Sequence, residues 1–379
     1  MEPEISTNVL PTYARYDLKI TRGEGVWLYD QYGNQYLDFV AGIAVVGLGH
    51  CHPDITTAAH AQIDQLWHTS NLYWTEPMAE LSKRLNTRIG GGQTFFCNSG
   101  AESIEAGLKY ARKSTGNTGV IALKNSFHGR TYGALSATGQ PAKQKGFGPL
   151  VPEVYFAKLN DVESLTKAAS NGNIACILIE PIQGEGGINP AEKEFLTAAA
   201  ELARSHGALL FFDEVQTGVG RTGSYFAFEQ LNIKPDIVAL AKGLANGLPI
   251  GALIVSEKAA GGFQPGDHGT TFGGNLPSCA AACAVDKALT PELLKHVQCI
   301  GDHLRKNLES ISAVKDVRGM GLLIGCELDQ PAGPIITQCL KKGLLLSPAG
   351  DNVLRISPPL IIEKDHVNQA VEILKAVIK

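Results

Sequence analysis

The sequence predicts an α/β fold in which helices cover both faces of a mostly parallel sheet, followed by a smaller α+β region. Three observations support this prediction. Short uncharged apolar segments alternate with amphipathic ones through the middle of the chain, as in parallel sheets covered by helices. Polar residues gather after most of these segments, where open α/β sheets bind ligands. After about residue 273 the alternation ends in an alanine-rich helical segment and short strands.

The elements follow in chain order. Residues 24–39 predict a hairpin whose turn contains Gly33 and Asn34. From about residue 51, amphipathic helices such as 101–113 and 192–206 separate the predicted strands. The strand segments are 94–97, 119–123, 174–179, 208–212, 237–241 and 251–255. The last part of the chain predicts a helix over 277–289, a second helix, strands near 321–328 and 353–357, and a terminal helix over 364–378.

These elements suggest three parts of the chain. Residues 1–50 are expected to form an N-terminal segment that packs with the small domain. Residues 51–272 are expected to form the large domain, and residues 273–379 the C-terminal small domain. A chain of 379 residues is long enough for two domains of ordinary size.

Composition excludes some classes of function. The formal charge is −4, so no basic field favours a nucleic-acid partner. No apolar run approaches the roughly 20 residues of a membrane-spanning helix. The segment "MEPEISTNVLPTYARYD" starts acidic and lacks the apolar core of a signal peptide. We therefore expect a soluble, cytoplasmic protein.

The eight cysteines are scattered. Cys279 and Cys283 have helical spacing, and "HCH" at 50–52 resembles a fragment of a metal site. Neither has the second pair of ligands that a zinc site needs. We expect no metal, and reduced thiols that fill core space.

Lys242 is the most unusual residue of the central region. It follows the uncharged strand segment 237–241, in the run "IVALAKGLANGLPIGA". Lysine is almost never fully buried unless it is paired or functional. A lysine that marks the strand end and reaches water is the ordinary alternative.

Two further strand ends complete a chemical pattern. Ser99 and Glu102 have capping-box spacing, and the helix start at Ser99, Gly100 and Ala101 also suits a phosphate. Asp213 ends an apolar strand, where an unpaired carboxylate is costly. A lysine that forms a Schiff base, together with an aspartate that keeps a pyridine nitrogen protonated, is what pyridoxal phosphate requires.

Two other classes of function are alternatives. "GVGRTG" at 218–223 is a literal G-x-G-x-x-G and suggests a nicotinamide-dependent dehydrogenase. That fingerprint needs a helix opening at the glycines and an acidic residue at the end of the next strand. Here five residues intervene between strand and glycines, and the next strand ends at Lys242. A binding module without a cofactor would leave Asp213, Lys242 and the phosphate cradle as coincidences.

The ordered motifs resemble one family from about residue 10 to the C-terminus. The chain resembles the class III, fold-type I pyridoxal-phosphate aminotransferases, and among them the acetylornithine aminotransferases. The motifs are "GIAV…GLGHCHP", "TSNLYWTEP", "FFCNSGAESIEAGLKYAR", "FHGRTYGALS", "EPIQGEGG", "DEVQTGVGRTG", "AKGLANGLPIGA", "HGTTFGGN" and "LRISPPL". The resemblance implies a mostly parallel seven-stranded sheet in the large domain.

The resemblance also implies residue roles for the cofactor. Lys242 is the Schiff-base lysine and Asp213 pairs with the pyridine nitrogen. Gln216 reaches the ring hydroxyl, while Val215 and Phe127 pack on the two ring faces. Ser99, Gly100 and Ala101 hold the phosphate. Thr271 reaches the phosphate of a neighbouring subunit, which implies a homodimer with shared active sites.

The substrate roles come from the same resemblance. Arg130 is expected to bind the carboxylate distal to the reacting amine, and Arg355 the α-carboxylate of glutamate, because the guanidinium fork suits carboxylates. Glu185 is expected to pair with Arg355 when the substrate brings no α-carboxylate there, and to swing away for glutamate.

The implied reaction moves the ω-amino group of N-acetylornithine to 2-oxoglutarate in a ping-pong cycle. Ile43 stands where ornithine aminotransferases of the family place a tyrosine, which argues against free ornithine. Tyr13, Asn71 and Tyr73 are expected near the acyl end. Succinylornithine, succinyl-diaminopimelate, 4-aminobutyrate and ornithine remain alternatives, because pocket size separates acyl groups by only a few kcal/mol.

Overall fold

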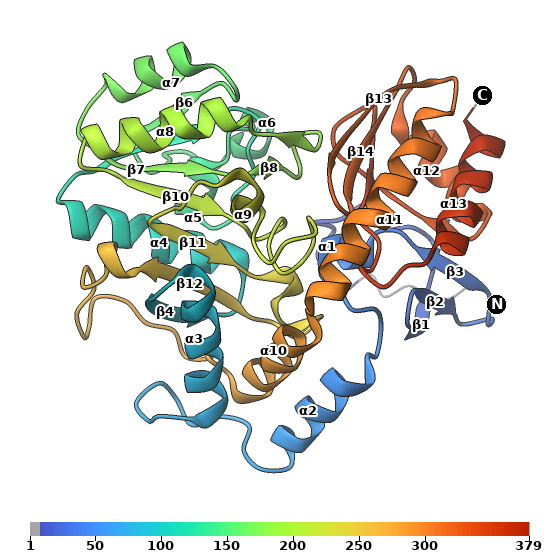
Figure 1. The fold of residues 1–379 in the computed structure, drawn as a ribbon, viewed down its shortest axis with the longest axis horizontal. Helices are drawn as coiled ribbons and strands as arrows, with labels where there is room; N and C mark the ends of the chain where they lie inside the picture. The colour runs from blue at the N-terminus through green and yellow to red at the C-terminus, as the bar shows by residue number, and fades with distance from the viewer. Residues whose placement is uncertain (1–7, 379) are drawn as a thin grey trace.

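A computed structural model describes residues 8–378. The ribbon has a large part built on a central sheet and a smaller part that contains the C-terminal helices and the N-terminal strands (Figure 1). Among the described residues, none of the helices combines the length and apolarity needed to cross a bilayer.

The central sheet has seven strands, as predicted. β12 pairs antiparallel with both β4 and β11, and all other pairings are parallel, so the sheet is mostly parallel. In spatial order the strands are β4 (Gly92–Cys97), β12 (Gly251–Ser256), β11 (Ile237–Leu240), β10 (Leu209–Asp213), β7 (Ile174–Ile179), β5 (Gly119–Leu123) and β6 (Val154–Ala157). The edge strand β6 was not among the segments predicted from the sequence.

Alternate residues of the central strands face two separate apolar layers. Ile177 and Ile179 of β7 join one cluster, whereas Leu178 joins the other. Burial on both faces explains why these strands are continuous apolar runs without period-two alternation. The helices of the large part are α3 (Glu76–Ile89), α4 (Gly100–Thr115), α5 (Tyr132–Ala137), α6 (Pro141–Gln144), α7 (Val162–Ala169), α8 (Lys193–Ser205) and α9 (Ala227–Leu231).

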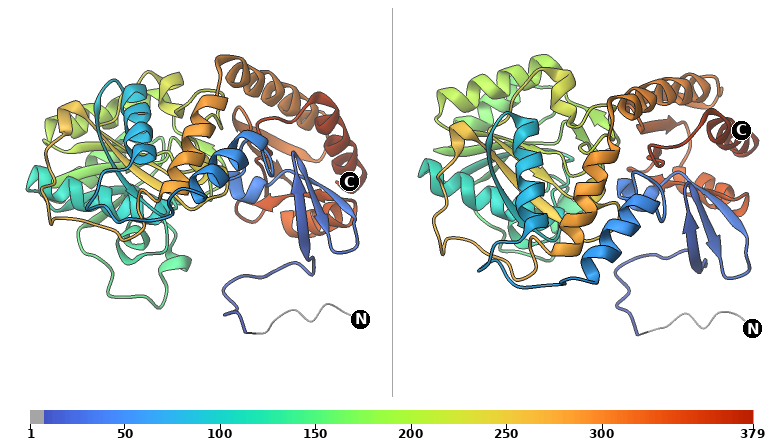
Figure 2. Two further views of the ribbon diagram at one scale, coloured as in Figure 1. Left: turned by 90° about the horizontal axis from the view of Figure 1, so that it is seen from below. Right: turned by 60° about the horizontal axis from the view of Figure 1, so that its bottom comes forward.

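Helix α10 (Leu276–Ala288) lies beside α2 (Pro53–Ile63), next to α3 (Figure 2). Buried Asp286 of α10 forms ion pairs with Arg84 and Arg88 of α3. This packing favours a domain boundary after α10. The three-part division at residues 50 and 272 remains a proposal.

The smaller part contains an antiparallel sheet flanked by helices. Its elements are α11 (Pro291–Glu309), β13 (Val314–Met320), β14 (Leu323–Leu328), α12 (Ala332–Lys341), β15 (Leu344–Leu345), β16 (Ser347–Pro348), β17 (Val353–Ile356) and α13 (Lys364–Val377). The hairpin predicted at 24–39 forms as β2 (Trp27–Asp30) and β3 (Gln35–Asp38), with β1 (Ile20–Glu24) beside β2. β15 pairs in parallel with β3, so the N-terminal strands lie against the C-terminal part (Figure 2).

The remaining short elements connect these layers. They are α1 (Ala41–Ala44), β8 (Ile182–Gln183), β9 (Asn189–Pro190), and two 3₁₀ turns, η1 (Lys242–Ala245) and η2 (Glu257–Ala259).

The glycine-rich segment 218–223 is a series of turns and opens no helix. The dinucleotide-fingerprint hypothesis is therefore wrong. Buried Arg221 within it donates to the carbonyls of Leu322 and Pro358 in the smaller part. The segment thus ties the two parts together.

All eight cysteines are free. Six are buried, as expected, but Cys51 and Cys299 are exposed, so the prediction that the thiols fill core space is wrong for these two.

Candidate active site

Lys242 starts η1 directly beyond β11 and lines a cavity of about 420 Å³. Burial, together with the charge of Arg355, lowers the pKa of Lys242 to about 8, and the carboxylates of Glu185, Asp213 and Glu180 oppose this shift. A much larger fraction of this amine is therefore uncharged near neutral pH than in an ordinary lysine. An uncharged amine can attack a carbonyl carbon or accept a proton.

Asp213 ends β10 and also lines this cavity. One carboxylate oxygen accepts the backbone N–H of Val215, and the other lies 2.7 Å from Nδ1 of buried His128. The second ring nitrogen of His128 is buried without a hydrogen-bond partner among the described residues. The pair places a fixed, hydrogen-bonded carboxylate in the floor of the cavity.

The N-terminus of α4 forms another wall. Ser99 caps the helix by accepting the N–H of Glu102, which confirms that half of the predicted capping box. The carboxylate of Glu102 accepts the N–H of Asn98 instead of the N–H of the cap residue Ser99, so the other half of the capping box does not form. Because the first N–H groups of a helix have no partner within it, Ser99, Gly100 and Ala101 present an anion-binding end to the cavity.

Gly100 in this wall packs so closely against Val215 that a larger side chain would not fit. A Cβ on Gly100 would lie 2.8 Å from a methyl carbon of Val215. Val215 and Phe127 both line the cavity, and so does Gln216, whose Oε1 is buried without a partner. The cavity therefore offers two apolar surfaces and unused polar atoms between them.

Of the two predicted substrate-binding arginines, Arg130 lines the cavity, whereas Arg355 is buried behind the lining and contacts it through Glu185. The Arg130 guanidinium stands 5.6 Å from the centre of the Phe127 ring, and its side chain is exposed at the cavity. Arg355 of β17 forms an ion pair with Glu185 and donates to Ser347 Oγ at 3.1 Å. Burial acts to raise the pKa of Glu185, but Arg355, with smaller contributions from Lys242 and Lys143, outweighs burial and lowers that pKa. Glu185 is thus held ionised against Arg355.

The structure brings together most of the predicted site residues, but not all. Thr271 is exposed and does not line this cavity; Tyr13 and Ile43 also lie outside its lining, with 74% and 41% of their surfaces exposed. Asn71 donates to the carbonyl of Gly273 at 2.8 Å, and Tyr73 is exposed. The structure does not bring these residues together around Lys242, so their roles remain proposals.

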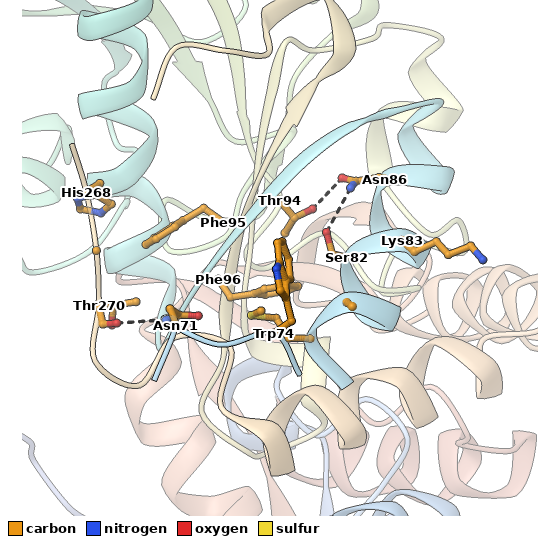
Figure 3. Close-up of a pocket in the computed structure, with 13 residues that line it drawn as sticks. Asn71, Trp74, Ser82, Lys83, Asn86, Thr94, Phe95, Phe96, His268 and Thr270 are labelled. Atoms are coloured by element: carbon orange, nitrogen blue, oxygen red, sulfur yellow. Dashed lines mark hydrogen bonds between the residues drawn. The ribbon is translucent and has the colours of Figure 1, made fainter. Parts of the chain in front are cut away.

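A second cavity, of about 570 Å³, lies between α3, β4 and the loop before α10 (Figure 3). Its labelled residues include Trp74, Phe95, Phe96 and Thr270. Trp74 is 90% exposed. Trp67, Leu72, Tyr73 and Phe272, close in sequence to residues that line this cavity, are also exposed.

Comparison with known proteins decides the family. Residues 11–378 match the family described as Aminotransferase class-III. The chain belongs to the class III aminotransferases. It is 46% identical over 381 residues to the acetylornithine aminotransferase of Aquifex aeolicus (strain VF5), covering 98% of this chain and 100% of that one.

Two solved structures are similar to this class III aminotransferase. One is the ornithine aminotransferase from Toxoplasma gondii ME49, with a TM-score of 0.93 and 32% identity, covering 98% of this chain and 92% of that chain. The other is the N-acetylornithine aminotransferase from Stenotrophomonas maltophilia K279a, with a TM-score of 0.85 and 34% identity, covering 97% and 96%.

Class III aminotransferases use pyridoxal phosphate, and the cavity fits it. The unpartnered Gln216 oxygen, the anion-binding end of α4, the Asp213 carboxylate and the amine of Lys242 match the polar groups of the cofactor. We propose that they hold its hydroxyl, phosphate, ring nitrogen and aldehyde carbon respectively, with Val215 and Phe127 on the ring faces. When bound, pyridoxal phosphate supplies a cationic ring that takes up the electron pair released from the substrate carbon.

The lowered pKa of Lys242 gives a prediction about cofactor uptake. The rate at which the apoprotein binds added pyridoxal phosphate should rise with pH through about 8, because only the uncharged amine is nucleophilic. Stopped-flow absorbance across this pH range measures that rate. A rate that stays constant through pH 8 would contradict the assignment of Lys242 as the attacking amine.

Among the titratable residues that line the cavity, sequence reasoning missed two, His128 and Glu180. Both lie inside quoted motifs, "FHGRTYGALS" and "EPIQGEGG". The position of Glu180 could have identified it: it directly follows the fully buried strand β7. Asp213 stands in the same way at the end of β10. Burial raises the pKa of Glu180, and Asp213 adds to this effect while His128 opposes it.

Proposed function

We propose that this aminotransferase moves the ω-amino group of N-acetylornithine to 2-oxoglutarate, giving N-acetylglutamate semialdehyde and glutamate, as a step of arginine biosynthesis. The observation that carries the two-substrate reaction is the Glu185–Arg355 pair at the Lys242 cavity. The identity of the amine rests on the acetylornithine aminotransferases to which the chain is similar.

In this proposal, each of three residues has a separate role. Lys242 accepts the proton from the substrate carbon that bears the amine and returns it to the cofactor side. Arg130, at the cavity mouth, binds the distal carboxylate: the α-carboxylate of N-acetylornithine or the side-chain carboxylate of glutamate. Arg355 binds the α-carboxylate of glutamate with two parallel hydrogen bonds.

Glu185 makes one site serve both substrates in this proposal. N-acetylornithine brings no carboxylate next to its ω-amine, and an unpaired Arg355 would be a buried, uncompensated cation. Glu185 neutralises it. For glutamate, the substrate carboxylate takes over Arg355, and Glu185 moves aside.

Replacing Glu185 with glutamine tests this switch. The half-reaction with N-acetylornithine should slow by about tenfold or more, because breaking a buried pair leaves a charge unpaired. The glutamate half-reaction should change much less. Single-turnover absorbance measures both rates.

Glu24→Gln is the control, because Glu24 also pairs with an arginine, Arg22 in β1, and does not line the cavity. It should leave both half-reactions intact. Equal slowing of the two half-reactions by Glu185→Gln would refute the switch.

The amine donor is tested by steady-state kinetics with 2-oxoglutarate as acceptor. We expect kcat/KM for N-acetylornithine to exceed that for ornithine or 4-aminobutyrate. Ornithine is the second candidate, because the Toxoplasma gondii ornithine aminotransferase shares the fold at a TM-score of 0.93. A higher kcat/KM for ornithine would transfer the assignment to that amine.

We also propose that the active form is a homodimer with shared sites. The exposed apolar surface around the second cavity supports this. Thr270, next to Thr271, is hydrogen-bonded to Asn98, and Asn98 lines the Lys242 cavity. The loop of Thr271 therefore lies between this surface and the chain's own site. The predicted cytoplasmic location stays a prediction.

Mixing two inactive variants tests the shared site. Thr271→Asp should repel the cofactor phosphate in the partner's site, and Lys242→Ala should inactivate its own site. Mixed dimers contain one intact site, so remixing should restore about a quarter of the wild-type activity. Activity that stays at the level of the separate variants, with dimers confirmed by ultracentrifugation, would contradict sharing through Thr271.

A further inference from the structure

Glu180 is a buried carboxylate that the mechanism above does not use. It follows β7 and lines the Lys242 cavity. Its two oxygens accept backbone N–H groups from two different loops, that of Phe127 at 3.0 Å and that of Gly184 at 3.1 Å. Within residues 8–378 no lysine or arginine forms a salt bridge with it. Its hydrogen-bonding capacity is thus directed at the backbone.

Both loops carry groups that face substrate or cofactor. The ring of Phe127 lines the cavity beneath the Arg130 guanidinium. The carbonyl of Gly184 accepts from Arg355 at 3.4 Å, and the next residue, Glu185, pairs with the same arginine.

The Gly184 loop has little freedom of its own. A Cβ on Gly184 would lie 2.5 Å from the side-chain amide of Gln216. A shift of this backbone would therefore move Gln216, Glu185 or both. Within the cavity the carboxylate of Glu180 joins this loop to the Phe127 loop. Outside the cavity lining, the side chain of Gln183 also donates to the carbonyl of Lys124 at 2.8 Å.

We propose that Glu180 is a positioning residue: by accepting one N–H from each loop, it fixes Phe127 and the Gly184–Glu185 segment relative to each other, and so sets the balance between the two half-reactions. This inference rests on the proposed two-substrate function. It assigns Glu180 no contact with the reacting atoms. Its effect passes through the backbone to Glu185 and Arg355.

A carboxylate suits this role better than an amide of the same shape. Two ionised oxygens accept two N–H groups, whereas glutamine has one acceptor oxygen and an NH₂ donor. In Glu180→Gln, one of the two backbone N–H groups must face another donor. A buried N–H left unpaired in this way destabilises the contact, so one loop is released.

The matched control is Glu214, which neighbours Asp213 but does not line the cavity. It is also fully buried and accepts two backbone N–H groups, those of Ala227 at 3.1 Å and Phe228 at 3.0 Å. Glu214→Gln therefore makes the same chemical change in a loop away from the substrate.

Amide hydrogen exchange of the holoprotein without substrate tests the positioning directly. In Glu180→Gln, exchange in residues 124–130 or 182–187 should accelerate by about tenfold or more, as for the loss of one hydrogen bond. Exchange in β7 should stay unchanged. Glu214→Gln should accelerate exchange only around residues 226–228. This readout is independent of which amine is the substrate, so its failure is distinct from a failure of the proposed function.

Half-reaction rates give the second readout. Glu180→Gln should slow the amine half-reaction several-fold more than the glutamate half-reaction, whereas Glu214→Gln should leave the ratio unchanged. If Glu180→Gln does not fold, Glu180→Asp, which keeps the charge but is one methylene shorter, should show the same local exchange. Unchanged exchange in both loops, or the same shift of the ratio in Glu214→Gln, would overturn the proposal.

Discussion

Replacing Lys242 with alanine should reduce the rate of transamination by about 10³-fold or more. The variant loses the group that accepts the proton from the substrate carbon, and general base catalysis alone contributes up to about 10⁴-fold. The buried amine, with its pKa near 8, is the group in the cavity best suited to that step. Steady-state assays with N-acetylornithine and 2-oxoglutarate measure the loss.

Lys145→Ala is the control, because Lys145 is exposed and does not line the cavity. It should retain wild-type activity. If Lys242→Ala kept more than about a tenth of the wild-type rate, Lys242 could not be the general base.

Replacing Asp213 with asparagine should lower kcat by about 10² to 10³-fold, the cost of removing one preorganised electrostatic group from an active site. Asparagine keeps the shape and still accepts the N–H of Val215, but it carries no charge to keep the ring nitrogen protonated. The contact with His128 should also change, since that pair is buried. Single-turnover rates of both half-reactions measure the effect.

The neighbouring Glu214→Gln separates this effect from the general loss of a buried carboxylate. Burial raises the pKa of Glu214 to about 7. Its side chain accepts the backbone N–H of Ala227 and does not line the cavity. This control should keep most of the activity. A similar loss in Asp213→Asn and Glu214→Gln would argue for a stability effect and against the electrostatic role of Asp213.

The sequence predicted the central fold because its strands are buried on both faces. Segments such as 174–179 and 119–123 carry no charge and end at polar motifs, so both the strands and their positions in the chain could be predicted. The edge strand β6 was missed, because its residues are only partly buried and no uninterrupted buried run marks it. The two-residue strand β15 was missed as well, because its partner β3 lies more than 300 residues away in the chain.

The candidate site was predictable where local chemistry is unusual. Lys242 and Asp213 are charged residues after apolar strands, and the Ser99 cap has a recognisable spacing. The roles of His128 and Glu180 depend on contacts across the sheet, 85 and 53 residues apart in sequence, which spacing cannot reveal. Thr271 does not line the cavity of its own chain, so its predicted role depends on the homodimer proposed above.

The most direct test of the central claim is the visible absorbance of the purified holoprotein during one half-reaction. Without 2-oxoglutarate, N-acetylornithine should bleach the yellow absorbance of the lysine-bound cofactor, and added 2-oxoglutarate should restore it. Ornithine and 4-aminobutyrate should bleach it far more slowly. Bleaching by glutamate but not by N-acetylornithine would keep the aminotransferase and contradict the proposed substrate.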